Sequence, residues 1–278
     1  MSRCRPAWLA LIGLLVASAA QAAEPTGCVL RKGLYDAWLS LGKRSLISLP
    51  KIGALVGASK AAPEPASAQE IHNEYQTFFQ CLSDIALAAG NDDGHSLCKE
   101  AAADRIGSLV CQVALYVKTN RAGGKELLDV LPASKKGADL IWDLEAIADA
   151  GESDKGFPPL FAPKGPAYKI IDEVFVLALD DRETAMSKYF HIVGAASGTG
   201  AQYTDSQIKL LLRESPVLVV KHWEVMRQYQ PKLKKLLADL SAELGAAEMN
   251  KIRQGVAGFC TKGNLDCPEI LKFFGRPQ

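Results

Sequence analysis

The chain has 278 residues, of which 48% are hydrophobic and 23% charged, and its formal net charge at pH 7 is +1. This length is enough to bury a sizeable core, as one large domain or two small ones. The hydrophobic content excludes a largely disordered chain, and the balanced charge disfavours nucleic-acid binding, so we expect no nucleic acid among the partners.

The first residues have the layout of a secretory signal peptide. A short basic region precedes the almost wholly apolar residues 7–20, and Ala20 and Ala22 match the small-residue cleavage pattern. The apolar run is shorter than the roughly 20 residues that a membrane-spanning helix needs. We therefore expect residues 1–22 to be removed and the mature protein to be periplasmic or secreted. A lipoprotein anchored at Cys28 is the alternative, but the residues before that cysteine do not fit a lipidation site.

The cysteines support export, because an even number in an oxidising compartment predicts disulfides. Those that follow the signal peptide are Cys28, Cys81, Cys98, Cys111, Cys260 and Cys267. We predict a Cys260–Cys267 disulfide, since a short, turn-rich segment separates these two residues. Cys98 and Cys111 are expected to share one helix about 20 Å apart, too far to bond. A structural zinc site is the alternative, but no CxxC spacing supports it.

Residues 23–69 are expected to form a basic helical arm and a linker. Apolar residues between Leu30 and Leu41 follow a helical spacing, and residues 57–69 are rich in Ala, Pro and Ser. Residues 29–60 hold six basic residues against one acidic residue. This excess suggests weak contact with an anionic membrane or a cell-wall polymer. The alternative is a solvated helix face that packs on the rest of the protein.

Residues 70–278 are expected to form an all-α domain. The pattern predicts a disulfide-stapled helical bundle or an array of helical hairpins with about nine or ten helices, because apolar residues recur at helical spacing and no strand-like alternation occurs. Expected helices follow Ser67, Asp180 and Thr204, and otherwise occupy residues 96–118, 125–150 (as a pair), 167–179, 216–244, 246–258 and 268–274.

Three local signals define the ends of these helices. Ser67 with Glu70, and Thr204 with Gln207, match the capping box. Ser215 before a proline is a further start signal, and the apolar stripe that follows predicts one long helix through residues 216–244.

Two segments are candidate binding loops. Residues 151–166 are rich in proline, contain Phe157 and Phe161, and could mark a boundary inside the domain. Residues 194–203 are rich in glycine and end at Tyr203. We predict that Phe157, Phe161 and Tyr203 contact a partner, because aromatic residues on loops are efficient anchors. The alternative is that the two phenylalanines pack the loop onto the core.

Motifs for catalysis are weak. Ser40 and Lys43 match S-x-x-K but lack the companion motifs of penicillin-recognising enzymes, and residues 194–200 lack the ending of a phosphate-binding loop. His191 and His222 could meet near Glu224 as a metal or acid–base cluster, although ordinary helix histidines are the alternative.

Paired carboxylates are the remaining route to an enzyme. Glycan hydrolases use two such groups, and Glu173, Asp180, Asp181 and Glu224 are the candidates here. No motif distinguishes any of them from ordinary surface carboxylates.

The sequence favours an exported, non-catalytic protein without a cofactor or metal. Its expected partner is another exported protein, which it binds as an inhibitor, an immunity-type protein or an adaptor. The alternatives are an exported helical hydrolase of peptidoglycan-type glycans and a carrier of a small ligand or haem.

Overall fold

The computed structural model describes residues 28–47, 67–88, 98, 101–150, 156–182, 184–260 and 267–275. Every regular element in these ranges is helical, which confirms the all-α prediction. The α-helices are α1 (Leu34–Ile47), α2 (Ala68–Leu87), α3 (Arg105–Lys118), α4 (Gly124–Val130), α5 (Asp139–Asp149), α6 (Pro166–Leu179), α7 (Ala185–Ala195), α8 (Gly198–Glu214), α9 (Pro216–Lys221), α10 (Trp223–Met226), α11 (Gln230–Cys260) and α12 (Cys267–Phe274). Short 3₁₀ turns, η1 (Ala101–Ala103) and η2 (Arg227–Tyr229), precede α3 and α11.

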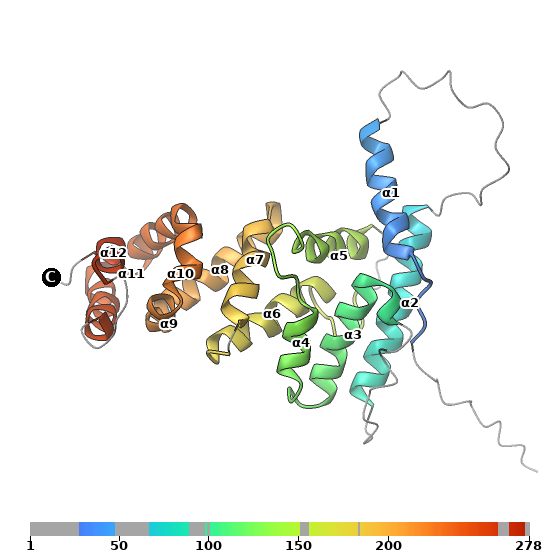
Figure 1. Cartoon of the computed structure of the whole chain (residues 1–278), viewed down its shortest axis with the longest axis horizontal. Coiled ribbons are helices and arrows are strands. Elements are labelled where there is room, and N and C mark those ends of the chain that lie inside the picture. The colour runs from blue at the N-terminus through green and yellow to red at the C-terminus, as the bar shows by residue number, and fades with distance from the viewer. Residues whose placement is uncertain are drawn as a thin grey trace, which may run out of the picture.

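The helices follow one another along the long axis of the molecule (Figure 1). Helices α1 and α2 lie at one end, and α12 lies at the other end beside the C-terminus. Most helices pack against their neighbours in the chain, as in α2 with α3, α6 with α7, and α11 with α12. This arrangement is an array of helical hairpins, one of the two forms that the sequence predicts.

Some expected features fall outside the described residues. The predicted signal peptide and most of the predicted linker lie there, and the division into residues 23–69 and 70–278, with a possible boundary at 151–166, stays a prediction. None of the helices in the described ranges is long and apolar enough to cross a membrane.

The N-terminal end is held by two disulfides. Cys28, before α1, is bonded to Cys81 on α2, with 5.7 Å between the Cα atoms. Cys98 is bonded to Cys111 on α3 at a Cα–Cα distance of 5.4 Å. The prediction that Cys98 and Cys111 cannot pair is therefore wrong. Helix α3 begins only at Arg105, so Cys98 does not belong to the helix and can lie beside Cys111.

The predicted Cys260–Cys267 disulfide is absent from the structure. Both residues are free thiols, and the Cys267 Sγ atom donates a hydrogen bond to the Cys260 carbonyl oxygen at 3.2 Å. Burial, with the hydrogen bond to Cys267, raises the pKa of the Cys260 thiol to about 12. Cys260 is therefore almost wholly protonated at neutral pH, which slows thiolate-dependent oxidation.

A buried carboxylate connects the first three helices. Asp104 caps α3 by accepting a hydrogen bond from the Gly107 N–H at 2.9 Å. It also accepts bonds from the Tyr35 N–H and the Tyr75 hydroxyl, each at 3.0 Å. Because each donor comes from a different helix, Asp104 fixes α1 and α2 relative to α3.

Several predicted helix boundaries are wrong, although the capping box of α2 at Ser67 and Glu70 is confirmed. The expected helix after Thr204 begins earlier, at Gly198, and Thr204 is buried within α8. The expected long helix 216–244 begins and ends where predicted, since α9 starts at Pro216 and the backbone of α11 leaves the helical conformation at Gly245 (φ +77°), but it is divided into α9, α10, η2 and the first part of α11.

Gly200, in the first turn of α8, serves close packing. A Cβ atom on Gly200 would lie 2.2 Å from the Trp142 ring, so only glycine lets α8 approach α5 this closely. Trp142 also donates its indole N–H to the Ile192 carbonyl oxygen at 3.2 Å. The glycine-rich segment predicted as a loop is thus mostly the start of a packed helix.

Candidate functional site

The segment between α5 and α6 positions Phe157 on the surface of the array. The Leu160 N–H donates a hydrogen bond to the buried Ser83 hydroxyl of α2 at 3.1 Å, and the Phe161 ring meets Phe79 edge-on at 5.7 Å between centroids. Gly165 has φ of +99°, and a Cβ atom there would lie 2.8 Å from the Phe157 ring. The segment is therefore fixed to α2, and Phe157 lies directly against the backbone of Gly165.

Phe157 borders two open depressions. The first, which we name the tyrosine hollow, has a volume of about 540 Å³ and joins residues from α5, α6, α8 and the segment before α6. Its lining residues are Glu145, Asp149, Phe157, Pro163, Lys164, Tyr168, Thr199, Gln202, Tyr203 and Ser206.

Two tyrosines of the hollow are held by carboxylates. Tyr168 and Tyr203 meet edge-to-face with 4.8 Å between ring centroids. The Tyr168 hydroxyl donates to Glu145, and the Tyr203 hydroxyl donates to Asp172. Burial, with the bond to Glu145, raises the pKa of Tyr168 to about 12, and burial with the bond to Asp172 raises the pKa of Tyr203 above its ordinary value. Both rings therefore stay protonated at neutral pH, which favours a binding surface over tyrosinate chemistry.

A lysine of the chain itself already lies on this surface. The Lys164 ammonium is 4.0 Å from the centroid of the Tyr203 ring, within the range of a cation–π interaction. Two carboxylates, Glu145 and Asp149, line the same hollow one helical turn apart. Aromatic faces beside carboxylates form a surface that suits a basic side chain.

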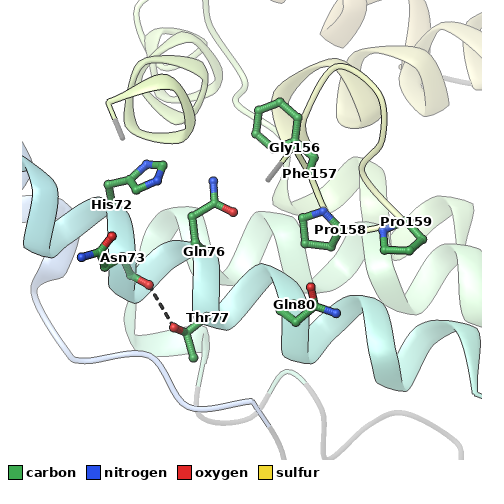
Figure 2. A pocket seen from close by; sticks show the side chains of 9 residues that line it. All are labelled: His72, Asn73, Gln76, Thr77, Gln80, Gly156, Phe157, Pro158 and Pro159. Atoms are coloured by element: carbon green, nitrogen blue, oxygen red, sulfur yellow. Dashed lines mark hydrogen bonds between the residues drawn. The ribbon is translucent and has the colours of Figure 1, made fainter. Parts of the chain in front are cut away.

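The second depression, which we name the amide groove, has a volume of about 510 Å³, and the described residues that line it carry no charged side chain. Figure 2 shows its two walls, one on α2 and the other on the segment before α6. Its lining residues are His72, Asn73, Gln76, Thr77, Gln80, Gly156, Phe157, Pro158 and Pro159. Phe157 belongs to both depressions, so they adjoin each other at this residue.

The structure brings two of the three predicted partner-binding residues together. Phe157 and Tyr203, both half-buried, line the tyrosine hollow, although Tyr203 lies on helix α8 and not on a loop. Phe161 is 1% exposed and belongs to the core, so its prediction as a surface anchor is wrong. A loop of this length must bury some apolar area to be ordered, and Phe161 supplies it.

Three of the four carboxylates suggested for a hydrolase, Glu173, Asp181 and Glu224, form ion pairs in the structure. Glu173 is 2% exposed and binds Arg121 in a bidentate manner, with Lys169 at 2.8 Å. Asp181 pairs with Lys221 and His222, and Glu224 with Arg227. Each of these three groups is neutralised by its own basic neighbour.

The suggested histidine cluster is also divided. The His222 Nε2 atom lies 2.8 Å from Asp181, whereas His191 has only a long contact of 3.5 Å with Ser187. Burial lowers the pKa of His191 below its ordinary value. In the ranges that the structure describes, no group of His, Cys, Asp and Glu side chains could hold a metal ion.

Sequence reasoning missed Tyr168, Glu145, Lys164 and the polar face of α2. The polar face of α2 could have been found from the sequence, because its uncharged polar residues share one side of a helix. They occupy positions 72, 73, 76, 77 and 80. The convergence of Tyr168 with Tyr203 has no such signal, since the two residues lie on different helices.

No family model, curated protein or solved structure matches this chain.

Proposed function

We propose that this chain is an exported, non-catalytic protein that binds another exported protein through the tyrosine hollow. The observation that carries the proposal is the convergence of Phe157, Tyr168 and Tyr203 from separate elements on one open surface. Aromatic side chains with few rotatable bonds, already held in place, lose little entropy on binding. This is the property expected of the anchor residues of an inhibitor or adaptor.

A basic side chain is the partner group that this hollow fits best. Glu145 and Asp149 supply negative charge, and Lys164 shows that an ammonium group is accepted over the Tyr203 ring. A lysine or arginine of the partner would displace Lys164 and gain the same ring together with the carboxylates.

Photocrosslinking tests this assignment when it is carried out in the organism that makes the protein, before the protein is purified. A photoreactive residue at position 157 should crosslink to one partner protein of the same compartment. The same residue at position 210 is the control, because Leu210 is exposed on α8 but lies outside the hollow. Equal crosslinking from both positions would contradict the proposal.

The captured partner then allows a quantitative test. Tyr203→Ala and Glu145→Gln should each weaken its affinity more than about tenfold, roughly 1.4 kcal/mol. Lys125→Ala, an exposed change on α4, should leave affinity unchanged. A large fall in melting temperature with full affinity would instead assign these residues to the core.

The hydrolase alternative makes a different prediction at the same residues. A zymogram on cell wall should show no cleared band for the wild type if the protein only binds. Clearing that disappears in Glu145→Gln would replace binding with glycan cleavage, in which Glu145 and Asp149 would be the carboxylate pair.

Export rests on the N-terminal pattern and is supported by the two disulfides. Residues 1–30 fused to a reporter should direct it out of the cytoplasm. N-terminal sequencing of the mature protein should begin near Ala23, and a mature chain that starts at Met1 would refute this part of the proposal.

A further inference from the structure

The amide groove has unused hydrogen-bonding capacity. Within the described part of the chain, the half-buried Gln76 amide makes no hydrogen bond, and Figure 2 shows it between His72 and the segment before α6. Gln80 donates one amide hydrogen to Asp84 at 2.7 Å and keeps its carbonyl oxygen free. These two amides therefore offer both a donor and an acceptor to a ligand.

His72 extends the same row. Its Nδ1 atom lies 2.8 Å from the Ile147 carbonyl oxygen, which can only accept, so Nδ1 carries the hydrogen. In the neutral ring Nε2 is then left as an acceptor. The ring is buried and held by this bond, and Gln80 is held by its bond to Asp84, so two of the three polar groups in the row from His72 through Gln76 to Gln80 have fixed positions.

The spacing of this row matches an extended polypeptide. Residues four apart on an α-helix are separated by about 6.0 Å along its axis. Alternate residues of an extended chain present their N–H and C=O groups on the same side every 6.6–6.8 Å or so. Over the two steps from His72 to Gln80 the mismatch stays near 1.5 Å, which side chains of this length can absorb. About five extended residues would span the row.

The opposite wall also suits such a segment. Phe157, Pro158 and Pro159 present apolar surface, and the proline nitrogens carry no hydrogen that would need a partner. The Ser83 and Phe79 contacts hold this wall in place. Since none of the described residues that line the groove is charged, these residues favour an uncharged segment over an acidic or basic one.

We infer that the partner protein is bound through an uncharged segment in extended conformation, which lies along the amide groove and continues past Phe157. A lysine or arginine that follows this segment then enters the tyrosine hollow. Phe157 connects the two depressions, because it lines both. The inference rests on the proposed function and adds the form of the partner's recognised segment.

A library of random 12-residue peptides displayed on phage, selected against the full-length protein, tests the inference. Enriched peptides should share about five uncharged residues next to a lysine or arginine. Gln76→Ala combined with Gln80→Ala should weaken the binding of these peptides at least tenfold. Gln254→Ala, an exposed amide on α11, is the matched control and should leave binding unchanged.

Backbone methylation tests the extended conformation itself. Two versions of an enriched peptide are made. One is N-methylated at the odd-numbered residues and the other at the even-numbered residues. Because only one register faces α2, one version should lose at least tenfold in affinity while the other binds nearly as well as the parent peptide. Equal effects of both patterns, or enriched peptides that bind as helices, would overturn the inference.

Other outcomes separate this inference from the proposed function. Peptides that need Tyr203 but tolerate loss of Gln76 and Gln80 would refute the role of the groove and leave the proposed function standing. If no peptide is enriched while the crosslinked partner still needs Tyr203, the role of the groove is likewise refuted and the proposed function still stands. Binding of N-acetylglucosamine oligomers that requires Gln76 would assign the groove to a glycan and overturn the inference.

Discussion

The two ends of the helical array are closed by different means. At the N-terminal end, two disulfides attach Cys28 and Cys98 to α2 and α3, and Asp104 joins three helices through buried hydrogen bonds. At the C-terminal end, Cys260 and Cys267 are free, and α12 is held by packing.

Aromatic contacts are part of that packing. Phe273 lies 5.1 Å from Trp223 and 5.0 Å from Phe274, measured between ring centroids. Arg253 donates a hydrogen bond to the Phe274 carbonyl oxygen at 3.0 Å. Helix α12 buries an apolar face of its own, whereas Cys28 and Cys98 themselves lie outside the helices of the described residues. The comparison indicates that covalent bonds add to burial at the N-terminal end, whereas packing alone closes the C-terminal end.

Removing the longer disulfide should have the largest effect on stability. Cys28→Ala with Cys81→Ala opens a link between residues 53 positions apart, which should cost about 4 kcal/mol on the chain-entropy model. The shorter Cys98–Cys111 link should cost about 3 kcal/mol. Urea unfolding measures both, and Cys260→Ala with Cys267→Ala is the control. Equal losses in all three double variants would remove the distinction between the two ends.

Asp104→Ala tests the non-covalent part of the N-terminal closure. The change leaves the Tyr35 and Gly107 N–H groups and the Tyr75 hydroxyl without their acceptor. Unfolding free energy should fall by about 3 kcal/mol, because unpaired buried donors cost roughly 1–3 kcal/mol each and partial rearrangement recovers some of this. Asp129→Ala, an exposed change on α4, should shift stability by less than about 0.5 kcal/mol. A similar result for both aspartates would refute the role of Asp104.

Glu173 lies between the two ends and gives a pH-dependent test. Burial alone would raise the pKa of Glu173, but Arg121 and Lys169 outweigh burial and lower it below the ordinary value. A lowered folded-state pKa stabilises the fold at every pH above the unfolded pKa of about 4.3, and this contribution is lost as pH falls through the folded-state pKa.

Glu173→Gln should therefore cost about 1–2 kcal/mol at pH 7, a modest value because Arg121 is partly exposed. The difference between variant and wild type should shrink as pH falls below 4. Urea unfolding at a series of pH values measures it, and a constant difference across that range would contradict the proposed ion-pair contribution.

The smallest effect concerns the free thiols of the C-terminal end. Unfolded, unreduced protein treated with a maleimide should carry the label on Cys260 and Cys267, and none of the four N-terminal cysteines Cys28, Cys81, Cys98 and Cys111 should be labelled. Peptide mass spectrometry identifies the sites. Recovery of a Cys260–Cys267 disulfide would restore the pairing expected from the sequence and make the two ends more alike.

Features that depend on a few adjacent residues were predictable from the sequence. The capping box at Ser67 and Glu70 is such a case, because its two hydrogen bonds close within one turn. The all-α class follows from apolar spacing repeated over many turns. Prominent aromatic residues near turn signals also led to Phe157 and Tyr203, two members of the tyrosine hollow.

Only the tertiary structure decided how distant segments meet. The glycines in the first turn of α8 could equally have marked a loop. The close contact of Gly200 with the Trp142 ring decides that this segment is a packed helix. The pairing of Cys98 with Cys111 depends on where α3 begins, and that start is fixed by Asp104. Likewise, Phe161 is buried while Phe157 is half-exposed because Phe79 on α2 covers only one of them. Local sequence encodes hydrogen bonds within a turn, whereas these contacts depend on the relative positions of whole helices.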